Sequence, residues 1–523
     1  MQDRVKEFWQ LRKAAVSSAS GLVATQHHLA SDIGADILSR GGNAIDAAIA
    51  AGLALGVAEP WMSGLGGGGF MTVYLAKSKT VKVVEFGMCA AENAKASDYP
   101  LLSGGENSAM SFNWPKVEGD RNIHGPLSIA VPGYVKGISA ALENFGTMPW
   151  KEIIEPACQL AEFGLPIDWY SSGKINLMAR GLATYDETRH IYLADGLPPV
   201  ADLDGKIVGL KLGNLSQTYR QLQNEGPSTY YTGSLASDIA SDLKSVGSRI
   251  TLNDLNNYEA RIVDPLTKSY RGNKISVSGE LTAGSSLLHA LETIESSIPE
   301  NIQTPDGSTY QHYIEALLAS YQHRLNTLGA GNPAGNTTHI STSDKEGNVV
   351  SLTQTIMSGF GSRIMLPKTG LLMNNGMMWF DPRPNTANSV VGGRYPLCNM
   401  CPTIVEKKNG NIIAVGACGG RKIFPSVFQL VSFMLDFDMP VEEALHQARI
   451  DNSGTAEITV MDHMDEYILK ELLTKYPKAK VRPNGVMPNL FALPQMVERE
   501  ASGMSVGGCF IPSPHAKVSK PTT

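Results

Sequence analysis

Hydrophobic and polar residues alternate in two runs near the middle of the chain, 339–343 and 349–355. Such alternation is typical of β-strands, and the polar stretch between the runs contains a glycine, as hairpin loops commonly do. The pattern therefore predicts a β-hairpin whose turn is centred on Glu346. In that register Thr337 faces Thr355 across the two strands, which places two hydroxyl groups side by side.

The same patterns predict helices and strands along the rest of the chain. A first helix is expected to begin at Ser31 or Asp32, and Asn43 caps a second one. The second helix is apolar on all sides, as buried helices are, and residues 148–270 are expected to be mainly helical. Further helices are expected at 285–295, 309–328, 425–436, 440–448 and 463–475, and strands at 21–24, 72–74, 81–86, 363–373, 402–406, 411–417 and 457–461.

Length and charge limit the classes of protein that fit this sequence. A chain of 523 residues predicts two or three domains or one large α/β unit. The net charge of -6, without any run of Lys and Arg, argues against a nucleic-acid-binding surface. The start of the chain is rich in charged residues and no apolar run is long enough to span a membrane, so we expect neither a secretion signal nor a membrane partner.

The cysteines and glycines narrow the chemistry further. The six cysteines are scattered, so we expect free thiols and a cytoplasmic location. Cys398 and Cys401 have the spacing of a metal-binding pair, but neither a second pair nor a neighbouring histidine accompanies them, and we expect no metal. The glycine-rich loop 64–69 lacks the Gly-Lys-Ser/Thr ending of a phosphate-binding loop, so we expect it to pack closely against a site instead.

The position of Thr337 indicates a chemical role. A threonine hydroxyl is a weak nucleophile unless a base lies within hydrogen-bonding distance. If the chain were cut between Asn336 and Thr337, the new α-amino group of Thr337 would be such a base. The segment 328–336 is rich in Gly, Pro and Asn and marks a junction. The residues alone leave a second interpretation open, because threonine pairs are also common across the strands of ordinary sheets.

Longer motifs add a family resemblance. The small-subunit motifs of the γ-glutamyltransferase family resemble TTH at 337–339, DKEGNVVSLTQT, GLLMNN, PLCNMCPTI and GACGGRKI in this chain. The family's large-subunit opening resembles residues 41–70, GGNAIDAAIAAGLALGVAEPWMSGLGGGGF. The resemblance extends over most of the sequence. It implies an α/β fold, a four-layer αββα sandwich of the N-terminal nucleophile hydrolase type, with a large fragment 1–336 and a small fragment 337–523.

The resemblance also implies roles for individual residues. Thr337 matches the nucleophile, which attacks the carbonyl of Asn336 to split the chain and later carries the acyl group of the substrate. Thr355 matches the threonine that orients this nucleophile. Gly419 and Gly420 match the two glycines whose backbone N–H groups form the oxyanion hole.

The residues that hold a γ-glutamyl head group in the family are replaced in this chain. Trp379 occupies the position of an acidic residue and Met357 that of an asparagine. Cys398 and Asn399 stand where the family has two serines, and 87–97 contains no arginine. A buried charge without its partner is costly, so we expect glutathione to be a poor substrate.

Five residues are candidates for contacts with the substrate. Asn399 is a neutral hydrogen-bonding group, and Cys398, Thr338 and Asn375 belong to the matched motifs. Arg421 could bind a carboxylate through two parallel hydrogen bonds, or form a structural salt bridge, and both interpretations remain open. The neighbouring histidine of the TTH motif is either a packed hairpin residue or has a direct role.

The segments WP at 114–115, DRN at 120–122, GPLSIAVPG and MPW resemble a divergent branch of the family, which includes oxamate amidohydrolase and cephalosporin-acylase-like proteins. This resemblance implies an autoprocessing N-terminal-threonine amidohydrolase or acyltransferase without a cofactor. Its partners would be a small-molecule amide and a water or amine acceptor. The two fragments would form a heterodimer, which can pair into a tetramer. A genuine γ-glutamyltransferase or glutathione hydrolase is the first alternative, and an unprocessed, catalytically silent binding or scaffold protein is the second.

Overall fold

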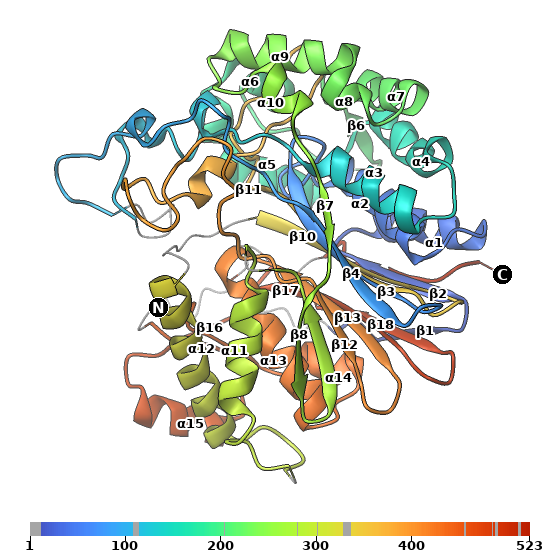
Figure 1. The fold of residues 1–523 in the computed structure, drawn as a ribbon, viewed down its shortest axis with the longest axis vertical. Coiled ribbons are helices and arrows are strands. Elements are labelled where there is room, and N and C mark those ends of the chain that lie inside the picture. The colour runs from blue at the N-terminus through green and yellow to red at the C-terminus, as the bar shows by residue number, and fades with distance from the viewer. Residues whose placement is uncertain are drawn as a thin grey trace.

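Two antiparallel sheets of seven strands each pack face to face at the centre of the molecule (Figure 1). In the first sheet the strand order is β19-β2-β10-β11-β3-β4-β7, and in the second it is β1-β18-β17-β13-β12-β9-β8. The computed structural model describes residues 12–107, 114–202, 204–279, 281–300, 302–327, 336–453, 457–483, 485–486, 490–510 and 514–522. The predicted junction at 328–335 lies outside these described residues.

Each sheet combines strands from both halves of the chain. The first consists of β2 (Gly21–Thr25), β3 (Gly68–Leu75), β4 (Thr80–Phe86), β7 (Arg261–Val263), β10 (Asn336–Asp344), β11 (Val349–Met357) and β19 (Lys517–Ser519). The second consists of β1 (Val16–Ser18), β8 (Leu266–Tyr270), β9 (Asn273–Val277), β12 (Thr403–Glu406), β13 (Ile412–Cys418), β17 (Leu493–Arg499) and β18 (Ser505–Cys509). Smaller sheets pair β5 (Leu165–Ile167) with β6 (Val208–Leu210), and β15 (Thr459–Met461) with β14 (Ile450–Asp451) and β16 (Lys480–Arg482).

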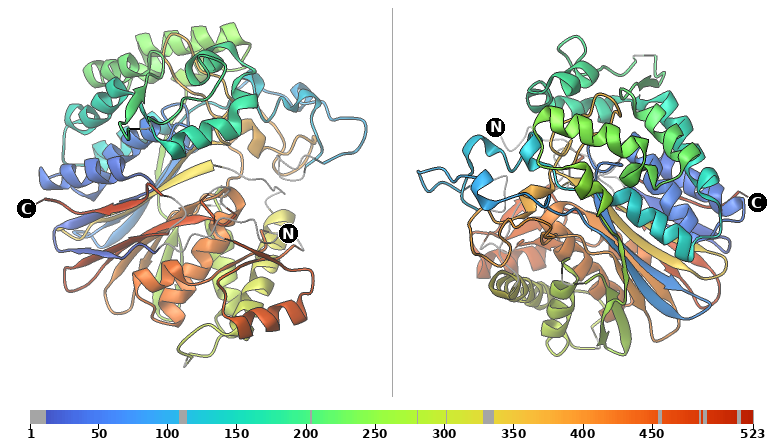
Figure 2. Two further views of the ribbon diagram at one scale, coloured as in Figure 1. Left: turned by 180° about the vertical axis from the view of Figure 1, so that it is seen from behind. Right: turned by 45° about the horizontal axis from the view of Figure 1, so that its top comes forward.

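Helices cover the outer faces of both sheets, which confirms the expected four-layer αββα sandwich (Figure 2). The helices on the first sheet are α1 (His28–Ser39), α2 (Ala44–Ala58) and α3 (Tyr134–Phe145). Those on the second sheet are α11 (Gly284–Ile294), α13 (Ile423–Asp436) and α14 (Val441–His446), with α12 (Gly307–Thr327) packed against α11 and α15 (Glu466–Lys475) against α12.

The segment that was expected to be mainly helical, 148–270, forms an additional group of helices above α2 and then crosses between the sheets (Figure 1). From Arg261 onward it is extended, because β7 joins the first sheet and β8 the second. The helices of this segment are α4 (Trp150–Phe163), α5 (Trp169–Leu182), α6 (Asp186–Tyr192), α7 (Leu215–Glu225), α8 (Thr229–Thr232), α9 (Ser234–Val246) and α10 (Leu252–Asn256).

The predicted start of α2 agrees with the structure, whereas the predicted start of α1 does not. Asn43 caps α2 through a capping box with Asp46, and every residue of α2 is buried, as its apolar surface predicted. The prediction that α1 begins at Ser31 or Asp32 is wrong. His27 is the N-cap, because its side chain accepts a hydrogen bond from the N–H of Leu29, and the helix therefore starts one turn earlier.

The strand expected at 363–373 is not formed. Among these residues only Met365 and Leu372 make a mutual β-bridge. Arg363 has a φ of 64°, and Gly370 one of 66°, so the backbone turns at both ends of the segment instead of extending. The two apolar runs of this segment, 364–366 and 371–373, are buried in a folded loop, and Pro367 and Lys368 between them are exposed.

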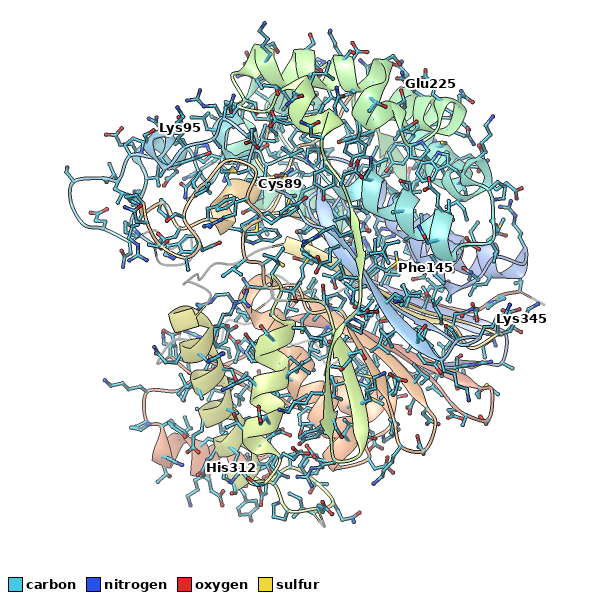
Figure 3. All side chains as sticks on the ribbon, viewed as in Figure 1. Cys89, Lys95, Phe145, Glu225, His312 and Lys345 are labelled. Atoms are coloured by element: carbon cyan, nitrogen blue, oxygen red, sulfur yellow. The ribbon has the colours of Figure 1, made fainter. Side chains whose placement is uncertain are left out.

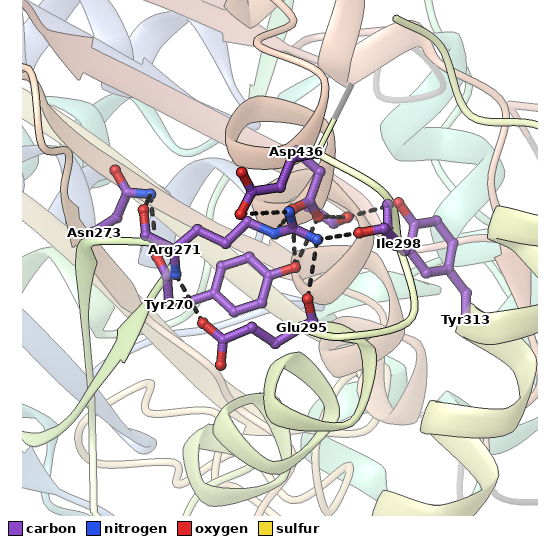
Figure 4. Close-up of polar contacts among 9 residues, drawn as sticks. Tyr270, Arg271, Asn273, Glu295, Ile298, Tyr313 and Asp436 are labelled. Carbon is purple, nitrogen blue, oxygen red and sulfur yellow. Dashed lines mark hydrogen bonds and ion pairs between the residues drawn. The ribbon is translucent and has the colours of Figure 1, made fainter. Parts of the chain in front are cut away.

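A buried polar cluster fastens the β8–β9 turn to the helices beneath the second sheet (Figure 4). The guanidinium of Arg271 forms an ion pair with Asp436 over 2.7 Å, and the hydroxyl of Tyr270 donates to the same carboxylate over 2.9 Å. Arg271 also donates to the carbonyl oxygens of Glu295 and Ile298. Because a buried charge needs partners on several sides, this cluster ties α11, α13 and the edge of the sheet into one unit.

Candidate active site

The inner end of the β10–β11 hairpin brings the two predicted threonines together. The strands pair in the predicted register from the turn to Thr338, and the register shifts beside Asn336. At this shift the hydroxyl of Thr337 donates a hydrogen bond to Thr355 Oγ1 over 3.4 Å. The backbone N–H of Met357 donates to the same oxygen over 2.8 Å, so the Thr355 hydroxyl is held in place from two sides. Both threonines are buried.

The hairpin turn, marked by Lys345 in Figure 3, lies at the edge of the molecule, whereas Thr337 lies at the opposite end of β10. Side chains of β10 alternate between the two faces of the first sheet. Ser341 donates to a carbonyl of β13 over 3.3 Å and therefore points between the sheets. Thr342 points the other way and donates to the carbonyl of Ala44 in α2 over 2.7 Å. The strand thus presents one polar row to each neighbouring layer.

His339 is a packed residue of this inter-sheet layer. Its two ring nitrogens lie within hydrogen-bonding distance of the hydroxyls of Thr353, at 2.9 Å, and Ser341, at 3.0 Å. Complete burial lowers its pKa to about 3, so the ring is neutral near pH 7. This environment favours the packing interpretation of the residue over a direct role.

Thr337 opens into a small pocket with about 230 Å³ of empty space, part of it open to solvent. The pocket is assembled from four separate segments of the chain: the hairpin, the short helix η5 (Gly376–Trp379), the loop before β12 and the loop after β13. Among the described residues that line it, none is charged. They are Thr337, Met357, Trp379, Asn399, Met400, Gly420 and Ile423.

The loop after β13 brings backbone close to Thr337. Gly419 has a φ of 133° and Gly420 one of 61°, both in a range that side chains with a Cβ rarely adopt. A Cβ on Gly419 would lie 3.0 Å from the Cα of Ala492. The turn at Gly419 therefore favours glycine strongly, and it places Gly420 in the lining of the pocket that Thr337 also lines.

Of the predicted substrate-binding residues, Asn399 is the one that lines the pocket. Its side chain is 7% exposed and makes no hydrogen bond to any residue that the structure describes. Cys398, its neighbour, is buried outside the lining; its backbone N–H donates to Leu281 and its carbonyl accepts from Arg324. Burial raises the pKa of the Cys398 thiol to about 12, which leaves it protonated and unreactive.

Thr338 and Asn375 are also outside the pocket lining. Because side chains alternate along a strand, Thr338 lies on the face of β10 opposite to Thr337. Its buried hydroxyl has no hydrogen-bond partner within the described part of the chain. Asn375 is fully engaged by the protein: its amide donates to the carbonyl of Ile123 over 2.6 Å and accepts from the N–H of Ser358 over 2.9 Å. It fixes the loop that follows β11.

Arg421 is buried beside the pocket and does not line it. Its guanidinium lies over the ring of Tyr321, 5.2 Å from the ring centroid, and Tyr321 donates to its carbonyl over 2.6 Å. Burial lowers its pKa to about 10, and the atoms Nε and Nη1 have no hydrogen-bond partner among the described residues. No carboxylate in the described ranges lies within ion-pair distance, so the structural salt bridge that was one of the two interpretations is not observed there.

Comparison with known proteins identifies this arrangement. The Gamma-glutamyltranspeptidase family model matches residues 30–333 and 326–507. The chain belongs to the gamma-glutamyltranspeptidase family. Within this family it is 33% identical to the Acylase ACY 1 proenzyme of Pseudomonas sp. (strain V22), over 86% of each chain. It is 30% identical to the Glutathione hydrolase proenzyme of Bacillus subtilis (strain 168), over 86% of this chain and 84% of the relative.

A solved structure supports the gamma-glutamyltranspeptidase fold independently. The crystal structure of cephalosporin acylase from Bacillus halodurans superimposes with a TM-score of 0.84, covers 100% of both chains and shares 23% sequence identity. Because its relatives in this family include a hydrolase and an acylase, the chain is an enzyme of the family's amidohydrolase and acylase type. Among the residues that the structure describes, no helix has the length and apolar character needed to cross a bilayer.

One notable group near the gamma-glutamyltranspeptidase-type site was not predicted. Glu59, at the end of α2, is fully buried, and burial raises its pKa to about 8, so its carboxyl is largely protonated near pH 7. It lies close to the end of β11, because the carbonyl of Met62 accepts from the N–H of Ile356 over 3.1 Å. A single acidic residue in the otherwise apolar run from Ala47 to Met62 is the sequence signal that could have indicated it. The pocket residues Met400 and Ile423 were also not predicted, although they belong to motifs that match the family.

Proposed function

We propose that this enzyme activates itself by splitting its own chain between Asn336 and Thr337 and then cleaves a small amide through an ester on Thr337. The observation that carries the proposal is the shared pocket of Thr337 and Gly420, with Thr355 hydrogen-bonded to the Thr337 hydroxyl. This set supplies a nucleophile, a group that orients it and backbone suited to an oxyanion hole.

The splitting step follows from this geometry. The hydroxyl oxygen of Thr337 attacks the carbonyl carbon of Asn336, and the C–N bond breaks as the nitrogen gains a proton, which leaves an ester. This first step already frees the α-amino group of Thr337. Water then hydrolyses the ester, which restores the hydroxyl of Thr337 and leaves Asn336 with a C-terminal carboxylate. An α-amino group titrates at about pH 8, which suits a general base near neutrality.

The substrate reaction reuses the same atoms. The α-amino group accepts the proton of the Thr337 hydroxyl while the oxygen attacks the amide carbonyl, and the developing oxyanion is stabilised by the N–H groups of Gly419 and Gly420. The proton passes to the leaving amine, and the acyl group remains on Thr337 as an ester. Water or a second amine then takes the acyl group.

The fragments 1–336 and 337–523 would remain together as a heterodimer, and we include the pairing of two such heterodimers in the proposal. In the first sheet β10 pairs with β2, and β11 pairs with β3, so strands of the small fragment lie between strands of the large one. In the second sheet β12 pairs with β9 in the same way. Separation would break these ladders and expose the apolar core between the sheets.

The free thiols of all six cysteines support a reducing compartment, the cytoplasm.

The intact mass of freshly purified protein tests the proposal, beside a Thr337→Ala variant. We expect two fragments divided at Asn336–Thr337 in the parent and one chain in the variant. A single uncut chain in both, stable over days, would refute self-splitting and favour a silent scaffold protein. A genuine γ-glutamyltransferase, suggested by the glutathione hydrolase relative, would instead split and turn over a γ-glutamyl anilide rapidly.

A further inference from the structure

The wall of the pocket opposite Thr337 is made of uncharged side chains. Met357, Trp379, Met400 and Ile423 supply two thioethers, an indole and an aliphatic group. Such surfaces favour apolar chains and flat groups, because sulfur and indole contact carbon closely and offer no counter-charge. A charged group enters such a space only by losing its hydration without compensation.

One polar side chain interrupts this wall. Asn399 is buried to more than nine-tenths, lines the pocket and has no hydrogen-bond partner among the described residues. The oxygen and nitrogen of this amide are not among the fully buried, unpartnered side-chain atoms of the described residues, so they reach the space of the pocket and are available to hydrogen-bond with a bound molecule. An amide carries both donors and an acceptor, so it pairs best with a neutral group that also has both.

The positions of the wall residues are fixed by the protein and do not depend on a ligand. The carbonyl of Trp379 accepts a hydrogen bond from the side chain of Asn388 over 2.7 Å. The short helix before it is held by Asn374, which accepts from the N–H of Gly376 over 2.8 Å. Met357 has a φ of 88°, a strained conformation that directs its side chain to a defined place beside Thr337.

Arg421 is a buried cation close to the pocket, but it does not supply a counter-charge for a carboxylate in the pocket. The guanidinium of Arg421 lies over Tyr321 and is outside the lining, although Gly420 and Ile423 on both sides of it line the pocket. A carboxylate in the pocket would therefore face methionine, indole and amide groups.

We infer that the acyl group taken by Thr337 is uncharged, with an apolar chain against Met357, Trp379 and Ile423 and one neutral hydrogen-bonding group at the amide of Asn399. Trp379 and Asn399 are thus the residues that determine specificity. This inference rests on the proposed acyl-enzyme chemistry of Thr337 and adds the chemical class of the substrate to it.

A matched series of p-nitroanilides tests the inference on the split, purified protein. The 4-carbamoylbutanoyl and glutaryl anilides have the same shape and differ in the charge of the terminal group, the γ-glutamyl anilide adds an α-amino group to the glutaryl chain, and the pentanoyl anilide lacks the polar terminus. We expect kcat/KM for the carbamoyl compound to exceed that for the glutaryl and γ-glutamyl compounds by on the order of 100-fold. We expect kcat/KM for the pentanoyl compound to lie between these values.

Variants of the pocket residues test which side chains cause the substrate preference. Asn399→Ala should lower kcat/KM for the carbamoyl compound about 10-fold, to the level of the pentanoyl compound, which should change little. Asn224→Ala, an exposed asparagine on α7, serves as the control and should leave all four values unchanged. Trp379→Phe, which keeps an aromatic wall, provides a second variant in case Asn399→Ala fails to fold, and should lower the values for the carbamoyl and pentanoyl compounds together.

The outcomes separate the two proposals. If the protein splits at Thr337 but cleaves the glutaryl or γ-glutamyl anilide as well as the carbamoyl one, the inferred substrate class is wrong while the nucleophile stands. Failure of split protein to cleave the carbamoyl anilide also overturns the inference. If the chain does not split at all, the proposed function itself fails.

Discussion

The hydroxyl of Thr337 lies 3.4 Å from the hydroxyl of Thr355 across the β10–β11 hairpin, and Thr355 is itself held by the N–H of Met357. The hydroxyl of Thr355 is therefore a fixed acceptor for the hydroxyl of Thr337, the proposed nucleophile. Since Thr337 begins the proposed small fragment, the same contact would orient it both before and after the chain is split.

Removal of this acceptor tests the positioning role. Thr355→Val keeps the shape of the side chain and loses the hydroxyl, so we expect chain splitting and kcat to fall on the order of 100-fold, because misplacement of a nucleophile is costly. Thr355→Ser should restore most of the rate. Equal splitting rates in the valine variant, followed by mass over time at matched melting temperature, would show that the contact does not orient Thr337.

The glycine pair gives a second prediction. Gly419→Ala must adopt a φ near 133° and approach Ala492, so we expect a loss of about 1–3 kcal/mol in unfolding free energy and a fall in kcat on the order of 100-fold. Gly410→Ala, in the turn before β13 with a φ of 90°, is the control. It should lose stability by a similar mechanism and keep its splitting rate, measured by mass. A Gly419→Ala protein with normal turnover would argue against the oxyanion role.

The pH dependence of stability gives a third prediction. His339 has a pKa of about 3 in the folded protein and an ordinary value of 6.5 when unfolded. Between these values the unfolded chain binds one more proton than the folded one, so this residue makes stability fall as pH drops from about 6.5 towards 3. From pH 7 to pH 5 its contribution amounts to a loss of about 2 kcal/mol.

Urea unfolding at both pH values measures this contribution. A His339→Gln variant should lose about 2 kcal/mol less than the parent between pH 7 and pH 5, even if it is less stable at pH 7. His312→Gln, near the surface of α12, should keep the parent's pH dependence. An unchanged slope in His339→Gln would show that the ring is protonated in the folded state.

Two buried arginines give a matched pair for the fourth prediction. Arg324 donates to the carbonyls of Thr282 and Cys398, each over 2.7 Å, whereas Nε and Nη1 of Arg421 have no partner among the described residues. We expect Arg324→Met to lower the unfolding free energy by about 1–3 kcal/mol. Arg421→Met should leave it unchanged or raise it by about 1–3 kcal/mol, because a buried charge with two nitrogens that lack hydrogen-bond partners among the described residues is removed.

Chemical denaturation of both variants provides the measurement. A large loss of stability in Arg421→Met would reveal a structural pairing. If Arg421 binds a substrate carboxylate instead, the same variant would selectively raise KM for the glutaryl anilide, and this result would count against an uncharged acyl group.

Local patterns in the sequence were sufficient for the elements whose structure depends on nearby residues. The hairpin register follows from alternation and a short polar turn, and Asn43 caps α2 as predicted. The facing pair Thr337 and Thr355 follows from that register alone. The start of α1 was missed because His27, an unusual capping residue, takes the place of the serine and aspartate that statistics favour.

The tertiary structure decided everything that depends on segments far apart in the chain. The short apolar runs 364–366 and 371–373 fit a strand and a buried loop equally, and only the surrounding packing selects the loop. The sequence by itself predicted the facing pair Thr337 and Thr355 and the glycine turn, because motif and register are local, and the role of Thr337 as nucleophile stays a prediction. It did not determine that Asn399 faces the pocket while Thr338, Cys398, Asn375 and Arg421 lie outside its lining, because that depends on how four separate segments meet around Thr337.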